Sequence, residues 1–390
     1  MPKRLTRIAT FLIPAALVVG YVSYMGSTGR CAMCEVVVDS AVMLTGFQVD
    51  EPADAALEKS EAAEPGSVEK SEKPKTEAQK SAQDFRRIAR PGSVDIAETY
   101  DMSDPQIPTD EIHTLLPKDA IPALTDPETM PAADADWLPD HARIIVVTAG
   151  EGDDEQTVGV PIVILNWHEI VNMTVGGEPV AATYCPLCDS VTVFSRRLPA
   201  EVEGEEPTVL EFGVSGALYN SNVLMFDREG LGLWSQIAMR AVTGKRAGTS
   251  LEMMPLRMLS FEAFKEAHPG AHIVSNNTGH ERDYNWENRP YQGFFSNDRT
   301  LVPLRKMGQI LPKKTLGVGV SVGSKAWFVT DAALAEGDRT IETDRGPVVV
   351  SRTDAGVFVK AAPKGVRTVQ AFYYAWSAFY PDTRVIGKTE

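Results

Sequence analysis

The pattern of hydrophobic and polar positions after residue 140 is typical of a β-rich protein. Short apolar runs recur at regular intervals, and Gly, Asp, Asn or Pro stands in most of the gaps between them. Apolar runs of this kind, bounded by turn residues, indicate strands. The expected strands are Arg143–Thr148, Val158–Leu165, Val180–Tyr184, Val191–Phe194, Val209–Val214 and Val223–Phe226.

Helical periodicity is limited to short segments. Three apolar residues repeat at helical spacing in Ser260–Ala267, and Asn166–Asn172 is the second expected helix. Between about residues 107 and 138 the chain is acidic and rich in proline, which predicts an irregular wrap with little regular structure. Together these patterns predict a β-rich α+β fold.

Two parts of the folded region resemble each other, which predicts an internal repeat of a β-rich unit with short helices. Gly176–Val180 has a counterpart in Asp344–Val348, and Phe261–Val274 has one in Tyr373–Ile386. The second copy is shorter in its middle, and the stretch that it lacks contains both cysteines of the domain. We expect a working half at about residues 140–280 and a degenerate repeat at about residues 315–390. Chance similarity between hairpin sequences is the alternative.

The N-terminus has the character of an export segment. An apolar run from Ile8 to Met25 follows Lys3, Arg4 and Arg7. As a helix this run is about 27 Å long, just enough to span the hydrocarbon core of a bilayer. The basic flank predicts that the chain after it is exported. We expect residues 1–30 to be an N-terminal membrane anchor, with a cleaved signal peptide or a buried helix as alternatives.

Two further segments separate this anchor from the folded domain. Residues 31–50 form a juxtamembrane segment that carries a secondary thiol pair, Cys31 and Cys34. Residues 51–95 are expected to be a disordered linker, because Glu51–Asp84 has no aromatic residue and too little apolar surface to fold. The folded domain is then residues 96–390. It is expected on the periplasmic (extracytoplasmic) side of the inner membrane, as part of a single-pass protein.

Composition and charge narrow the classes of partner. Hydrophobic residues make up 43% of the chain and charged residues 23%, as in ordinary globular proteins. This excludes a polytopic membrane protein and a chain that is disordered throughout. The 38 basic and 53 acidic residues give a net charge of −15, which argues against binding to nucleic acid. The expected partner is the membrane, and a protein partner or small ligand stays open.

The strongest chemical motif is Tyr184-Cys185-Pro186-Leu187-Cys188. Thiols at this spacing bind one metal ion, form a disulfide or activate each other. Strand character on both sides favours a metal knuckle over a thioredoxin-type pair, which begins a helix. A knuckle with two cysteines needs further ligands, and His168 is the best-placed candidate, because a hairpin through Gly176-Gly177 returns it toward the thiols. A structural histidine beside Glu169 is the alternative. Sulfur with imidazole suits copper or zinc.

A second group of polar residues follows Phe212. The candidates for ligand binding, which turn formation explains equally well, are Asn220, Ser221, Asp227, Trp234 and Gln236. Ser215 lacks the spacing of a nucleophile elbow, which argues against a serine hydrolase. The sequence has no phosphate-binding loop and no dinucleotide-binding fingerprint.

Several of these motifs occur together in one family. Residues 107–390 resemble the bacterial and archaeal family catalogued as domain of unknown function 3179. The resemblance is carried by Lys118–Leu124, Asn166–Asn172, Thr183–Cys188, Phe212–Asn220 and Leu233–Gln236. The positions that match the family's motifs are His168, Cys185, Cys188, Asn220, Trp234 and Gln236. The chain departs from the family at Asp189, where Gly is usual, at Met173, where Asp is usual, and at Gly230-Leu231-Gly232, which replaces a more polar run. The resemblance implies no activity.

The sequence leaves three functions open, and with them the question of whether the protein is an enzyme. The first is a membrane-anchored exported protein whose Cys-x-x-Cys centre, with His168, binds copper or zinc. The second is a thiol–disulfide oxidoreductase in which Cys185 attacks and Cys188 resolves. The third is a non-catalytic module that binds a ligand or partner, with a structural cysteine pair.

Overall fold

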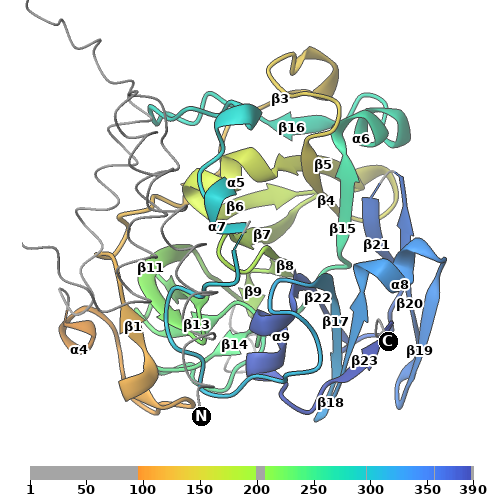
Figure 1. Ribbon diagram of the computed structural model, residues 1–390. Helices are drawn as coiled ribbons and strands as arrows, with labels where there is room; N and C mark the ends of the chain where they lie inside the picture. Colours follow the sequence, from red (N-terminus) through yellow and green to blue (C-terminus); the bar gives the residue numbers. More distant parts are fainter. Residues whose placement is uncertain (1–94, 199–206, 296, 355, 388–390) are drawn as a thin grey trace, which may run out of the picture. The chain divides into compact units, whose positions relative to one another are not determined.

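The computed structural model describes residues 95–198, 207–295, 297–354 and 356–387, which all belong to one compact unit. The expected anchor, the Cys31/Cys34 pair and the linker up to residue 94 lie outside the described residues. Within the described ranges the strands form two eight-stranded sheets, a five-stranded sheet and a two-stranded ribbon (Figure 1). No helix in these ranges is long and apolar enough to cross a membrane. The predicted β-rich α+β fold is confirmed.

Each large sheet combines strands from both parts of the chain. The first has the order β2 (Leu124–Thr125), β6 (Ile170–Val175), β7 (Glu178–Cys185), β8 (Ser190–Ser195), β22 (Arg367–Phe372), β17 (Leu316–Val322), β18 (Lys325–Thr330) and β23 (Arg384–Ile386). The second has the order β19 (Arg339–Thr343), β20 (Gly346–Thr353), β21 (Gly356–Ala361), β15 (Arg257–Ser260), β4 (Arg143–Ala149), β5 (Gln156–Pro161), β16 (His272–Val274) and β3 (Thr129–Pro131).

Helices are short and lie between strands. The α-helices are α4 (Ile96–Thr99), α5 (Ile162–His168), α6 (Phe261–Ala267), α7 (Gln292–Phe295), α8 (Asp331–Ala335) and α9 (Tyr373–Phe379). The 3₁₀ turns are η1 (Thr109–Glu111), η2 (Ala132–Asp134), η3 (Gly152–Asp154) and η4 (Trp286–Asn288). Helix α6 begins after Ser260, whose side chain accepts a hydrogen bond from the Ala263 backbone and so satisfies a free N–H group of the first turn.

The two large sheets have the same arrangement of strands. The three-stranded unit comes from the earlier part of the chain in the first sheet and from the later part in the second, and the four-stranded unit beside it comes mainly from the other part. In the first sheet β6-β7-β8 lies beside β22-β17-β18-β23, and in the second β19-β20-β21 lies beside β15-β4-β5-β16. Each sheet also contains a strand–helix–strand unit whose last strand forms a parallel pair. In β15-α6-β16 the last strand pairs with β5, and in β22-α9-β23 it pairs with β18. The sequence repeat itself stays a prediction.

The segment between β8 and β15 has no counterpart later in the chain. It supplies β11 (Phe212–Tyr219), β12 (Asn222–Asp227), β13 (Leu233–Ser235) and β14 (Arg240–Ala241) of the five-stranded sheet, which β1 (His113–Thr114) completes. It also forms the ribbon of β9 (Arg197–Leu198) and β10 (Thr208–Val209). We call this segment the insertion. Its aromatic residues Phe212 and Trp234 share one hydrophobic core with Cys185 and Cys188.

Several predicted boundaries were wrong around buried apolar runs. The run Val158–Leu165 is not one strand, because β5 ends at Pro161 and α5 begins there. The predicted helix Asn166–Asn172 is wrong in its second half, since strand β6 begins at Ile170. Every residue of α5 is buried, so its sequence lacks the polar face that marks a helix. The predicted strand Val209–Val214 is divided between β10 and β11.

Candidate thiol site

The two cysteines lie on one tight turn between two strands. Strand β7 ends at Cys185, β8 begins at Ser190, and the backbone N–H of Cys188 donates to the Cys185 carbonyl at 3.1 Å. Both are free thiols, and each is at most 1% exposed. Asp189 has φ 43°, a left-handed conformation that Gly adopts more readily, which fits the glycine usual at this position in the resembling family. The predicted strand–turn–strand setting is confirmed.

Cys188 is held between the insertion and the C-terminal part of the domain. Its thiol donates to the Ser221 carbonyl at 3.1 Å, and the Tyr374 hydroxyl lies 3.6 Å from its sulfur. The Tyr374 hydroxyl also donates to the Leu187 carbonyl at 2.7 Å, within the same turn. The backbone N–H of Phe372 donates to the Cys188 carbonyl at 2.8 Å. These contacts fix the position of Cys188.

Cys185 has a different environment. Its sulfur interacts with the Cys188 thiol and with the backbone N–H groups of Val223 and Cys188. Burial, followed by the hydrogen bond and charge of the second thiol, raises the pKa of Cys185 well above its ordinary value. The two N–H groups act in the opposite direction because they stabilise the thiolate. Burial prevails, so the folded site favours the protonated thiol of Cys185.

Glu169 brings a carboxyl group to this dithiol. It ends α5 with a φ of 56°, and this left-handed residue redirects the chain into β6. Its side chain is buried. Burial, and secondarily the charge of Cys185, raises the pKa of Glu169 well above its ordinary value. Sequence reasoning named Glu169 only as a neighbour of His168, although an isolated acid within an apolar run was a usable signal.

A small pocket adjoins Glu169 and the turn. It has a volume of about 100 Å³, and Glu169 and Tyr291 are its polar lining residues. Its walls include Leu116, Leu187 and Val223, together with further aliphatic side chains. Burial raises the pKa of the Tyr291 hydroxyl, and the charges of Glu169 and Cys185 add to this effect. Sequence reasoning missed Tyr291, which follows η4 and is distant from the motif in the chain.

His168 lies elsewhere, although it directly precedes Glu169. Its Nδ1 is 2.7 Å from the Pro122 carbonyl and its Nε2 is 2.6 Å from the Tyr284 hydroxyl. A carbonyl only accepts, so Nδ1 carries the proton and Nε2 accepts from Tyr284. The Tyr284 hydroxyl lies 2.6 Å from Thr278 Oγ1, which completes the chain of hydrogen bonds. Burial lowers the pKa of His168 to about 4, so the imidazole is neutral at pH 7.

These positions bear on the expected copper or zinc centre. Both ring nitrogens of His168 bind protein groups, and the thiols have other neighbours. Within the described ranges no group of three or more His, Cys, Asp or Glu side chains is arranged to hold a metal ion. The described residues therefore supply two sulfur atoms on one turn and no further ligand for a knuckle.

The other predicted site residues bind parts of the domain to each other. Asn220 accepts from the Arg305 backbone at 2.8 Å, and the Ser221 hydroxyl donates to the Val302 carbonyl at 2.7 Å. Asp227 accepts from Trp234 Nε1 at 2.7 Å. Gln236 donates to Thr183 Oγ1 and accepts from the Ser190 hydroxyl at 2.6 Å, which joins the insertion to the strands on either side of the cysteines. Their binding of an external ligand stays a prediction.

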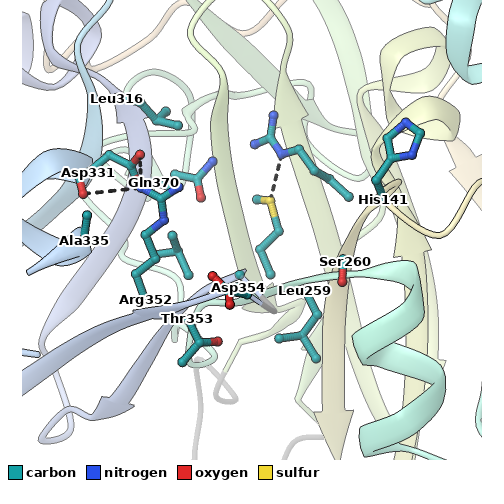
Figure 2. A pocket seen from close by; sticks show the side chains of 14 residues that line it. His141, Leu259, Ser260, Leu316, Asp331, Ala335, Arg352, Thr353, Asp354 and Gln370 are labelled. Atoms are coloured by element: carbon teal, nitrogen blue, oxygen red, sulfur yellow. Dashed lines mark hydrogen bonds and ion pairs between the residues drawn. The ribbon is translucent and has the colours of Figure 1, made fainter. Parts of the chain in front are cut away.

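The structure also has a larger pocket (Figure 2). It has a volume of about 590 Å³ and is lined by residues of β4, β15, β20 and β21, among others. Arg143 lines it and donates from Nη1 to Asp189 at 2.8 Å, and from Nε to the Met258 sulfur at 3.1 Å. Arg352 pairs with Asp331 at a second side of the pocket. Because Asp189 follows Cys188 directly, one ion pair connects this pocket to the cysteine turn.

Comparison with known sequences and folds gives one match. The sequence model of a family described as "Protein of unknown function (DUF3179)" matches residues 118–367, well over half of the chain. Comparison with curated proteins and with solved structures gives no match.

Proposed function

We propose that this chain, which belongs to the family of proteins of unknown function DUF3179, carries a thiol–disulfide redox centre formed by Cys185 and Cys188. One observation carries the proposal. Two free, buried thiols lie on one turn, and a buried carboxyl group interacts electrostatically with one of them. Two thiols on one turn are close enough for the second to resolve the mixed disulfide that the first forms with a substrate.

The two cysteines have separate roles in the proposed reaction. Cys185 is the attacking thiol, because the backbone N–H groups of Val223 and Cys188 favour its thiolate and partly offset the burial that raises its pKa. Glu169 is the carboxyl group that interacts with Cys185, and in its ionised form it takes the thiol proton. Cys188 then attacks the Cys185 sulfur, closes the intramolecular disulfide and releases the reduced substrate. The contacts with Ser221 and Tyr374 keep Cys188 in place for this step.

The proposal includes a compartment. The apolar run Ile8–Met25 behind three basic residues supports a protein that is anchored in the inner membrane, with its folded domain on the periplasmic side. The membrane is then a partner of the anchor. Disulfides form and persist in such an oxidising compartment, which suits a protein that exchanges them.

The first test measures metal, thiols and redox potential on one sample. The full chain, with Cys31→Ser and Cys34→Ser to remove the second pair, is purified without chelator and equilibrated with dithiothreitol. We expect a reduction potential above about −300 mV, the region below which structural disulfides lie. A lower potential would identify an inert disulfide. One copper or zinc ion per chain, lost in Cys185→Ser, would establish the metal centre instead.

The second test separates the roles of the residues. Cys188→Ser should trap a mixed disulfide between Cys185 and the substrate, whereas Cys185→Ser should trap none. Glu169→Gln has nearly the same shape but cannot take the proton, so the rate of exchange should fall about 100-fold at pH values where Glu169 of the unmodified chain is ionised, as for other general bases. Equal trapping by both cysteine variants would contradict the assignment of Cys185 as the attacking thiol.

A further inference from the structure

The larger pocket contains an arginine that uses only part of its hydrogen-bonding capacity within the protein. We propose that this pocket of about 590 Å³ binds a small monocarboxylate with an apolar chain, whose carboxylate oxygens accept hydrogen bonds from Nε and Nη2 of Arg143. The inference assigns a second site to the domain, and it does not depend on the thiol chemistry of the proposed function.

The guanidinium group of Arg143 has one edge without a strong acceptor. Nη1 donates to both carboxylate oxygens of Asp189, at 2.8 and 3.1 Å. Nε donates to the Met258 sulfur, which is a weak acceptor, and Nη2 is buried without a hydrogen-bond partner. The N–H groups of Nε and Nη2 point in the same direction, as two parallel hydrogen bonds to a carboxylate require. A buried charged donor without a partner is costly, so this edge favours an acceptor from outside the chain.

Met258 is the residue that a ligand displaces from this edge. It lines the same pocket, it is 4% exposed, and its sulfur lies 3.1 Å from Arg143 Nε, a contact that Figure 2 draws as a dashed line. A methionine side chain is flexible and adapts to a new neighbour at little cost. A carboxylate oxygen forms a stronger hydrogen bond with Nε than a thioether sulfur does, and the second oxygen gives Nη2 a partner. The exchange is therefore favourable.

The pocket lies where the two large sheets meet. Residues of β4, β15, β20 and β21 from the second sheet line it together with residues of β17 and β22 from the first. Figure 2 shows His141 and Ser260 on one side of the pocket, and Gln370 and Arg352 on the other. Small-molecule sites commonly form between structural units, with volumes of about 300–1,000 Å³. The position and the volume of this pocket both fit a ligand site.

The rest of the lining limits the ligand to one charge and an apolar body. Aliphatic side chains form part of the wall, among them Leu259, Leu316 and Val357. An alkyl chain gains free energy when it leaves water for such a surface. Asp331, which is paired with Arg352, and Asp354 also line the pocket. These carboxylates disfavour a second negative group at the far end of the ligand.

A second cation lies near His141, two residues before Arg143 in the chain. The ring of His141, which lines the pocket, is 5.7 Å from that of Trp286, and the Arg289 guanidinium carbon is 3.7 Å from the centroid of the Trp286 ring. Nη1 of Arg289 is also buried without a hydrogen-bond partner. Burial, and secondarily the charge of Arg143, lowers the pKa of Arg289. This second positive charge favours an anion over a neutral ligand of the same shape.

The test compares ligands by isothermal titration of the full chain. Hexanoate has the proposed carboxylate and chain, hexanamide has the same shape without the charge, acetate lacks the chain, and adipate carries a second carboxylate. Inorganic phosphate is an oxyanion without a chain. We expect hexanoate to bind at least about 10-fold more tightly than each of the other four. Hexanoate binding that is no tighter than that of hexanamide would overturn the inference, and so would tightest binding of phosphate.

Variants assign the binding to the edge of Arg143. Arg143→Lys keeps the positive charge beside Asp189 but has no planar edge, so the affinity for hexanoate should fall at least about 10-fold. Met258→Leu has a similar volume and no sulfur, so it should bind hexanoate as tightly as the unmodified chain or more tightly. Arg345→Lys, at an arginine that does not line this pocket, is the control and should keep the affinity.

Each outcome of these variants decides one step. Equal affinity of Arg143→Lys and the unmodified chain would overturn the assignment to the guanidinium edge. An affinity of Met258→Leu as low as that of Arg143→Lys would mean that Met258 holds the ligand and is not displaced by it. The ligand series in the unmodified chain tests the inference even where Arg143→Lys fails to fold.

Discussion

The side chains of His168 and Glu169, consecutive at the end of α5, have entirely different partners. His168 Nε2 lies 2.6 Å from the Tyr284 hydroxyl, whereas the Glu169 carboxyl interacts with the Cys185 thiol. The left-handed conformation of Glu169 produces this separation, because it ends the helix and reverses the direction of the chain. The histidine therefore stabilises the fold in its neutral form, and the glutamate belongs to the thiol site.

Acid should destabilise the protein through His168. Its pKa is lowered from 6.5 to about 4, so the unfolded chain binds a proton between these values and the folded chain does not. Stability is therefore greatest above pH 6.5 and falls as the pH decreases toward 4. Each pH unit contributes about 1.4 kcal/mol, which gives a loss of about 2 kcal/mol between pH 6.5 and 5. Urea unfolding at several pH values measures this slope.

The matched variants for this slope are His168→Gln and His272→Gln. Glutamine at position 168 does not titrate, so the loss of stability between pH 6.5 and 5 should be smaller than in the unmodified chain, whatever the absolute stability. His272 is exposed, and its replacement should leave the slope unchanged. An unchanged slope in His168→Gln would show that another group governs the acid response.

The opposite pH dependence is expected from Glu169. Its raised pKa means that the folded chain retains the proton where the unfolded chain has lost it, so its contribution to stability declines as the pH rises above the ordinary glutamate pKa. Glu169→Gln removes this titration and should make the free energy of unfolding less dependent on pH above the ordinary glutamate pKa. Glu266→Gln, at an exposed helix position, is the control and should behave like the unmodified chain.

The part of the site that the sequence predicted is the part encoded locally. Cys185 and Cys188 are close because they share one turn, and strand-forming residues on both sides indicated that turn. Glu169 and Tyr291 are far apart in the chain. The residues between them include the strands from β6 to β16 and the whole insertion. No local pattern records that a residue after η4 meets the end of α5. The pocket between them was therefore beyond sequence reasoning.

The fold shows the same division between local and distant information. The β-rich class followed from apolar runs and turn residues, and α6 followed from the helical spacing of its apolar residues. Helix α5 was misread because its buried run has no polar face. The exchange of strands between the two large sheets depends on pairings such as β8 with β22, which join residues far apart in the chain. Propensity and periodicity contain no information about such pairs.

Asn172 should be essential for the stability of the fold. Its Nδ2 donates to the Phe212 carbonyl at 2.8 Å and to the Leu124 carbonyl at 3.3 Å, and its Oδ1 accepts from the Phe212 N–H at 2.9 Å. Asn172→Leu leaves these buried backbone groups unpaired and should cost about 3 kcal/mol or more of unfolding free energy. Asn297→Leu breaks similar bonds at an exposed position, where water replaces them, and should cost less than about 0.5 kcal/mol.

The side chain of Asp189 stabilises the cysteine turn, whereas its backbone conformation is unfavourable. Its carboxylate accepts from Arg143 Nη1 at 2.8 Å and from the Tyr184 hydroxyl at 2.9 Å, while its backbone has φ 43°. Asp189→Ala removes the ion pair and keeps the unfavourable backbone. Because Arg143 is partly exposed, the cost should be about 2 kcal/mol, below the range for fully buried pairs.

Asp189→Gly and Asp189→Asn separate these two properties. Glycine loses the same ion pair but adopts positive φ without penalty, so Asp189→Gly should be about 1 kcal/mol more stable than Asp189→Ala. Asparagine tolerates the conformation and retains an oxygen for Tyr184. The decrease in unfolding free energy of Asp189→Asn therefore measures the contribution of the aspartate charge to the ion pair alone. Denaturant unfolding of the three variants measures both terms. Equal stability of the glycine and alanine variants would mean that the backbone at Asp189 is not held in the left-handed region.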